Sequence, residues 1–242
     1  MTASAISCRS LLGLLLAVCL AGTAAAQTPA GGRLRLRTLL HDPLNPPAEF
    51  HVAGPKGGLE RLNLSVEGIG MAQEVVFENG TLRLFSTAAI DPSKPLADLA
   101  AACSVPADLK QGLVLIVPAG GTAKPPYKLM LLDDSAAAFP WGESRAINLT
   151  AVPLAMAAGE HRIQLKPAAV TRIPKVTRLN DFNQAHTRFF QKDGEDWLLV
   201  NERPTQYTGQ IRNIFLLFFM PGVPEVQVRT LIETDASNRP VR

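Results

Sequence analysis

The side chains best able to do chemistry in this chain are four histidines, an internal cysteine and several pairs of acidic residues. Glu49 and His51 are two positions apart, so they would share one face of a strand, and His41-Asp42 lies a short distance upstream. Two histidines and two carboxylates could close a metal site. Asp and His in loops and at strand ends are ordinarily solvated, however, so we assign no metal ligand.

The candidate nucleophiles lack the surroundings that activate them. Ser144 follows Gly142-Glu143 without the flanking pattern of a nucleophile elbow. Cys103 ends the apolar stretch Leu96–Cys103, which predicts a buried, inert thiol. The glycines of Gly54–Gly58 do not have the spacing of a phosphate-binding loop and indicate a hairpin loop instead.

Two acidic pairs, Asp133-Asp134 and Glu195-Asp196, are adjacent in sequence, so on a strand each pair points to opposite faces. We interpret them as solubilising charges at turns and strand ends. Distant carboxylates can meet in a fold, which leaves glycoside hydrolysis open. The sequence thus assigns no catalytic, cofactor-binding or metal-binding residue and favours a protein that is not an enzyme.

The charge balance gives no footprint for nucleic acid. The 242 residues carry 24 basic and 21 acidic side chains, a net charge of +3, and the basic residues do not form a strong cluster. The nearest approach is Arg33, Arg35 and Arg37, whose alternation predicts the solvated face of a strand with Leu34 and Leu36 opposite. Contact with anionic polysaccharide or lipid headgroups is the alternative.

Residues 1–26 have the pattern of a cleaved secretory signal peptide. Arg9 precedes an apolar run of about ten residues, and the small residues Ala24-Ala25-Ala26 provide a cleavage site before Gln27. The run is shorter than the roughly 20 residues that span a bilayer. An uncleaved anchor helix and lipidation at Cys19 are the alternatives.

Cleavage would remove Cys8 and Cys19 and leave Cys103 without a partner for an intramolecular disulfide. Exported eukaryotic proteins of this size more often carry disulfides, so we expect a bacterial protein that is periplasmic or secreted, with no membrane span after cleavage.

Short apolar runs and period-2 alternation separated by turn residues dominate the rest of the chain. Asn79-Gly80 and Asp193-Gly194 each mark a hairpin. The Ala-rich stretch Leu96–Cys103 is the one plausible helix. Short strands at such spacing predict an all-β sandwich or barrel.

The pattern also repeats approximately. The buried run Leu113–Val117, a Pro/Gly turn and the strand Lys128–Leu132 match Ile214–Met220, a Pro/Gly turn and Val226–Ile232, and Arg33–Leu40 matches Arg145–Leu149. We therefore predict two tandem antiparallel β-sandwich (Ig-like) domains at residues 27–135 and 136–235, with a flexible tail at 236–242. One large sandwich or barrel with a coincidental repeat is the alternative.

The run Ile214–Met220 has no polar side, so both of its faces need a cover. We predict that one face meets a sandwich core and the other an interface between domains or subunits.

The segment Phe139-Pro140-Trp141-Gly142, followed by a strand ending in Asn148-Leu149-Thr150, resembles a recurrent module of uncharacterised secreted bacterial β-sandwich proteins. The resemblance covers roughly the second half and implies a β-sandwich but no activity. Physically, Phe139 and Trp141 would plug the start of a domain, and Asn148 and Thr150 would hydrogen-bond the following turn. Stacking of Trp141 on carbohydrate is the functional alternative.

Together these features predict an exported, non-enzymatic structural or interaction module of the bacterial cell envelope that binds a protein partner. A periplasmic chaperone-like protein acting by strand addition, or a secreted carbohydrate-binding or carbohydrate-active protein, is the alternative. The sequence implies no cofactor and leaves any small-molecule ligand unknown.

Overall fold

The computed structural model describes residues 31–41, 49–65, 67–91 and 93–235. The predicted signal peptide at 1–26 and tail at 236–242 lie outside these residues and stay predictions, as does the division into domains at 135/136. None of the described residues forms a helix, so the all-β prediction is confirmed. The described part of the chain accordingly offers no helix of the length and apolarity that a membrane crossing needs.

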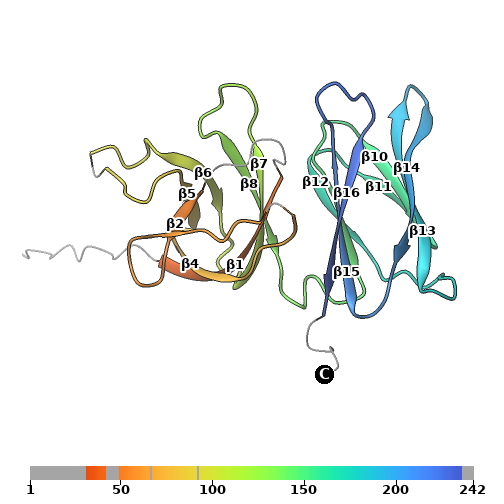
Figure 1. Cartoon of the computed structure of the whole chain (residues 1–242), viewed down its shortest axis with the longest axis horizontal. Helices are drawn as coiled ribbons and strands as arrows, with labels where there is room; N and C mark the ends of the chain where they lie inside the picture. Colours follow the sequence, from red (N-terminus) through yellow and green to blue (C-terminus); the bar gives the residue numbers. More distant parts are fainter. Residues whose placement is uncertain (1–30, 42–48, 66, 92, 236–242) are drawn as a thin grey trace, which may run out of the picture.

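The described residues form sixteen strands, eight in each half. Figure 1 shows their arrangement. Those of the N-terminal half are β1 (Gly31–Leu40), β2 (His51–Ala53), β3 (Leu59–Arg61), β4 (Gln73–Glu78), β5 (Thr81–Phe85), β6 (Leu99–Ser104), β7 (Gln111–Pro118) and β8 (Tyr127–Asp133). Those of the C-terminal half are β9 (Ser144–Asn148), β10 (Leu154–Ala158), β11 (His161–Leu165), β12 (Ala169–Ile173), β13 (Gln184–Asp193), β14 (Asp196–Gln206), β15 (Ile211–Phe218) and β16 (Gln227–Thr234).

The helix expected at Leu96–Cys103 is wrong. Residues from Leu99 onward form β6, which pairs with β5 from Ser104 opposite Thr81 to Leu99 opposite Phe85. Ala100 and Ala101 are buried against the N-terminal core. Their small side chains allow this close packing, and the backbone pairing with β5 outweighs the weak local preference of alanine for a helix.

The two halves have the same topology. The C-terminal half contains two four-stranded sheets in the orders β11-β10-β13-β14 and β12-β9-β15-β16. The N-terminal half has the same pairings, β3-β2-β5-β6 and β4-β1-β7-β8, in which each strand number is eight lower. There the two sets join into one eight-stranded sheet because Glu78 also pairs with Thr81 where β4 turns into β5.

Each half contains one parallel pair, which differs from the antiparallel sheets that we expected. β1 runs parallel to β7, and β9 runs parallel to β15. The first strand of each half enters the sheet beside the strand that begins the closing hairpin, and the long intervening chain permits this orientation.

The pairing of residues between neighbouring strands also corresponds in the two halves. Leu39 of β1 lies opposite Leu115 of β7, and Ile147 of β9 lies opposite Leu216 of β15. One strand further, Leu113 lies opposite Leu132, as Ile214 lies opposite Leu231. The strand correspondences predicted from the sequence repeat are therefore confirmed.

β7 and β15 are buried on both faces. Val114 and Ile116 point into the core of the N-terminal half, and Phe215 and Leu217 point into that of the C-terminal half. The residues between them face the other way and meet in a third cluster, which we call the junction core. It comprises Leu39, Leu113, Leu115, Phe139, Ile147, Ile214, Leu216 and Leu231.

The junction core contains equivalent residues from both halves, so the two parallel-containing sheets pack face to face, as Figure 1 shows for β7-β8 and β15-β16. The predicted two-sided cover of Ile214–Met220 is confirmed for Ile214 to Leu217, and the interface lies between the halves of one chain. Phe219 and Met220 are exposed beyond it.

The segment that joins the two halves and continues through β9, residues 139–150, has the burial and the turn contacts that its sequence predicts. Phe139 is fully buried, and Gly142 takes a left-handed φ of 89° that favours glycine. The Asn148 side chain donates to the carbonyl oxygens of Val152 and Leu165 and accepts from the backbone and hydroxyl of Thr150. The predicted turn contacts are confirmed.

We expect Leu115→Ala and Leu216→Ala each to lower the free energy of unfolding by about 2–5 kcal/mol, because each opens a cavity in the junction core. Urea denaturation followed by circular dichroism measures the change. Ile232→Ala, at a site that is 62% exposed, is the control and is expected to stay within about 0.5 kcal/mol. Equal stabilities of all four proteins would contradict the role of the junction core.

Candidate functional site

The histidines do not form a metal centre in the part of the chain that the structure describes. His51 is buried with its Nε2 3.7 Å from the Glu49 carboxylate, whereas His41 packs edge-on against Phe218 with ring centroids 4.2 Å apart. No group of three His, Cys, Asp or Glu side chains among the described residues could hold an ion. Asp42 lies outside those residues.

Cys103 and Ser144 are placed as packing residues. Cys103 packs partly buried against the N-terminal core, and burial raises the pKa of its thiol to about 11. Ser144 is buried at the start of β9, and its hydroxyl has no hydrogen-bond partner. A thiol with so high a pKa is protonated near neutral pH, so it is a poor nucleophile.

The interpretation of Asp133-Asp134 as a solubilising pair is wrong for Asp134. Its side chain is only 7% exposed and accepts two hydrogen bonds from the Arg37 guanidinium, at 2.7 and 2.9 Å. Arg37 also pairs with Glu233 from the other half, and Glu233 accepts a bond of 3.0 Å from Arg212. Asp133 instead holds a turn by accepting from the Ser135 backbone.

These four residues form one buried ion network across the junction. We call Arg37, Asp134, Arg212 and Glu233 the junction network. Arg37 and Asp134 belong to the N-terminal half, and Arg212 and Glu233 belong to β15 and β16. Asp134 and Glu233 also occupy equivalent positions in the two halves. Asp134 follows β8 and lies opposite Gln111 of β7, and Glu233 lies opposite Arg212, the equivalent residue of β15.

Aromatic rings complete this region. The Arg145 and Arg212 guanidiniums lie over the Phe139 ring, 4.2 and 4.6 Å from its centroid, and Arg212 also lies 4.2 Å from the Trp141 centroid. Arg145 donates to the carbonyl oxygens of Asp133 and Ala138. Trp141 is thus a partly buried plug against Arg212, while Phe139 is the fully buried one.

Burial affects the pKa values of the ionisable groups in the junction network. Burial raises the pKa of Asp134, against the opposing charges of Arg37 and Arg212. Burial also acts to lower the pKa of Arg37, but its hydrogen bonds and ion pairs with Glu233 and Asp134 raise it overall. The two guanidiniums and two carboxylates balance in charge, and their ion pairs join the two halves.

The junction network could not be identified from the sequence because its members lie far apart in the chain. Arg37 and Glu233 are separated by 196 residues. The usable signal was the sequence repeat itself, since acidic residues end the closing strand of both halves at Asp134 and Glu233. A repeat whose sheets pack face to face brings such positions together.

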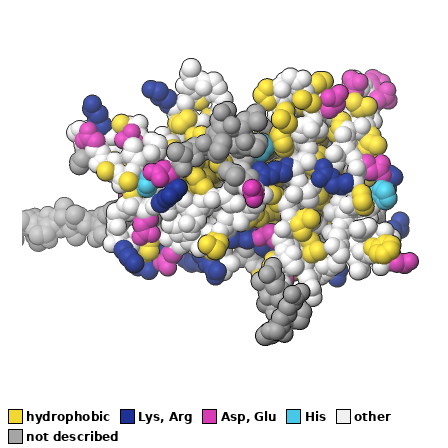
Figure 2. All heavy atoms as spheres, viewed as in Figure 1, with side chains coloured by type: hydrophobic (Ala, Val, Ile, Leu, Met, Phe, Trp, Pro, Cys, Tyr) yellow, Lys and Arg dark blue, Asp and Glu magenta, His cyan; other side chains and the backbone are white. Residues whose placement is uncertain are grey.

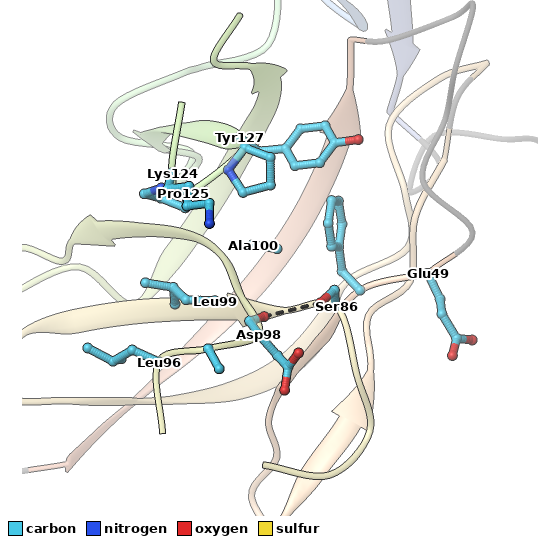
Figure 3. Close-up of a pocket in the computed structure, with 12 residues that line it drawn as sticks. Glu49, Ser86, Leu96, Asp98, Leu99, Ala100, Lys124, Pro125 and Tyr127 are labelled. Carbon is cyan, nitrogen blue, oxygen red and sulfur yellow. Dashed lines mark hydrogen bonds between the residues drawn. The ribbon is translucent and has the colours of Figure 1, made fainter. Parts of the chain in front are cut away.

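A pocket lies where β6 and β8 begin (Figure 3). It encloses about 700 Å³ between mainly apolar residues, including Phe50 and Tyr127, whose rings meet edge to face at 5.0 Å. Figure 3 shows the Glu49 and Asp98 carboxylates apart from each other, with the Ser86 hydroxyl bonded to the Asp98 carbonyl oxygen. This hollow therefore presents apolar surface with separate acidic groups at its rim.

A second surface is formed by the β13–β14 hairpin and the β15–β16 turn, which lie at the same end of the molecule (Figure 1). Gln191 joins them by accepting from the Val226 backbone at 2.9 Å. Five apolar residues here are between 36% and 49% exposed, and we call them the hairpin surface. They are Trp197 and Leu199 on one face of β14, Leu198 on its other face, and Phe219 and Met220 after β15.

The hairpin surface has an acidic margin. Figure 2 shows hydrophobic side chains over the β15–β16 turn and acidic ones over the neighbouring hairpin tip, where Asp193, Glu195 and Asp196 lie. Lys192 is the basic neighbour and lies 5.8 Å from the Trp197 ring. The expectation that Glu195-Asp196 marks a turn and strand end is confirmed.

We expect Asp134→Asn to lower the free energy of unfolding by about 3–5 kcal/mol, because it removes a buried charge from two buried guanidiniums. Asp133→Asn is the matched control and is expected to lose less than about 1 kcal/mol, since only one turn hydrogen bond is affected. Urea denaturation at pH 7 measures both. Equal losses would show that the Asp134 charge is not needed to compensate the Arg37 and Arg212 guanidiniums.

We expect Cys103 to react slowly with iodoacetamide at pH 8 in the folded protein and at the rate of a free cysteine in 8 M urea. Burial raises the pKa of the thiol, which leaves little thiolate. Mass spectrometry of the peptide that contains Cys103 separates it from Cys8 and Cys19. Equal rates in both conditions would contradict the burial of the thiol.

No protein-family model matches the chain, and no curated protein is significantly similar to it. The resemblance of the Phe139–Thr150 segment to secreted bacterial modules stays a prediction.

Proposed function

We propose that this protein is an exported, non-enzymatic interaction module of the bacterial cell envelope, built from two tandem Ig-like sandwich domains, and that it binds a protein partner at the hairpin surface. The signal-peptide pattern supports export, and the repeated topology supports the tandem arrangement.

The observation that carries the proposal is the outer edge of β14. Among the described residues β14 pairs only with β13, and three consecutive apolar residues, Trp197 to Leu199, are exposed near its start. An unpaired edge offers backbone donors and acceptors to a further strand, and exposed apolar side chains give that strand something to pack on. This combination suits binding by strand addition.

The edge is available along only part of its length. Further along β14, Arg203 donates to the Val228 carbonyl oxygen and to the Thr230 hydroxyl, both at 3.0 Å. This side chain bridges β14 to β16 and closes the sandwich there. Pro204 also lacks a backbone N–H to donate. The partner strand would therefore lie along residues 196–200, the section nearest the tip.

The acidic margin defines the partner's chemistry. Asp193, Glu195 and Asp196 outnumber the neighbouring Lys192, so a partner segment that combines apolar with Lys or Arg side chains complements this surface. A carbohydrate stacked on the exposed Trp197 ring is the second candidate, because an exposed indole beside polar groups is what a sugar-binding surface uses.

The test is quantitative cross-linking in a bacterial host that exports the full chain, comparing wild type with Leu199→Lys and Trp197→Ala. We expect one stoichiometric protein partner whose recovery falls about tenfold or more in both variants, since central apolar contacts contribute over 1 kcal/mol each. Val170→Lys, at an apolar site on β12 that is 36% exposed, is the control and should retain the partner.

Recovery of the same partner by all four proteins would contradict the hairpin surface as the binding site. Failure to recover any stoichiometric partner would contradict the interaction module. Binding to a glycan array by the wild-type protein, but not by Trp197→Ala, would establish carbohydrate binding instead.

A further inference from the structure

A small pocket opens beside the junction network. It encloses about 250 Å³ and lies between β1, the start of β7 and the segment that joins the two halves. We call it the junction pocket, and its lining residues are Arg35, Arg37, Ala72, Gln111, Asp134, Ala136, Trp141 and Arg212.

The lining has an excess of positive charge. Three guanidiniums, those of Arg35, Arg37 and Arg212, face a single carboxylate, that of Asp134. Arg37 and Arg212 are paired with Asp134 and Glu233. Arg145, close to this network, has Asp133 and Glu143 as further acidic neighbours, so Arg35 is the lining cation without an ion-pair partner among the described residues. A guanidinium without an ion-pair partner at the rim of a pocket lined by two further guanidiniums favours an added anion.

Arg35 has hydrogen-bonding capacity to spare. Its guanidinium has no hydrogen-bond or ion-pair partner within the described residues. Its neighbour on the same face of β1, Arg33, forms a bond of 2.9 Å to Glu74. The alternating arginines thus differ: one is paired on the surface, one is built into the junction network, and Arg35 stands free at the pocket.

Arg212 is a second, independent indication that the junction pocket holds a ligand. It is 95% buried, its two terminal nitrogens bond the Phe139 carbonyl oxygen and Glu233, and its Nε has no hydrogen-bond partner. Trp141 and Phe139 hold the guanidinium in place. A buried, immobilised donor without an acceptor is uncommon and is expected to have a ligand or water as its partner.

We propose that the junction pocket binds the oxyanion group of a small carboxylate or phosphate compound. Guanidiniums are the donors best suited to both groups because their paired N–H bonds match two anion oxygens. Arg35 closes on the anion from the rim, Arg212 supports it from the interior, and the Gln111 amide and Trp141 ring form the walls. The site is separate from the hairpin surface and does not depend on the proposed function.

Tryptophan fluorescence tests this directly, because the chain has two tryptophans and only Trp141 lines the pocket. In a Trp197→Phe background, the full chain is titrated with sodium phosphate and, separately, with sodium malonate, with NaCl added to keep the ionic strength constant. We expect a saturable change in Trp141 emission with a Kd of roughly 1 mM or below for at least one of the two anions. The anion with the lower Kd identifies the oxyanion class.

Arg35→Gln is expected to weaken that binding about tenfold or more, because it removes a charge-assisted contact. Arg33→Gln is the matched control, with the same change of charge on the same face of the same strand, and should keep the wild-type Kd. Absence of saturation with both anions up to about 50 mM would overturn the proposal, as would equal weakening by the two substitutions. Loss of folding in either variant is checked by circular dichroism, and neither side chain is buried.

Discussion

The two-sided burial of β7 and β15 is the constraint on which the rest of this structure depends. A strand that is apolar on both faces needs two covers, and each half of the chain provides only one core. Packing the two strands' second faces against each other in the junction core supplies the other cover for both. The halves are consequently parts of one folded body, held by Leu115, Leu216 and their neighbours.

The junction network follows from this packing. Once the two sheets lie face to face, the ends of β8 and β16 bring Asp134 and Glu233 to one place, where Arg37 and Arg212 neutralise them. Ion pairs withdrawn from water add little net stability over apolar packing, but the loss of one partner is costly. The network therefore makes one register of the two halves strongly preferred, and Arg35, which is not part of it, adds positive charge to the junction pocket.

Much of the fold could be predicted from local patterns. Alternation and turn residues indicated strands, and the repeated run–turn–strand pattern matched β7-β8 with β15-β16 correctly. The helix at Leu96–Cys103 failed because alanine's local preference is weak beside the pairing of β6 with β5. The parallel pairs were missed because side-chain alternation does not encode strand direction.

The sequence by itself determined which strands are buried on both faces, because Ile214–Leu217 has no polar alternate positions whatever its neighbours are. Only the tertiary structure decided what Asp134, Arg35 and Trp197 do. A charged or aromatic side chain is compatible with solvent, an ion pair or a ligand, and the choice among them is made by residues distant in sequence. For Asp134 those residues are Arg37 and Arg212; for Trp197 the open edge of β14 leaves the choice to a partner.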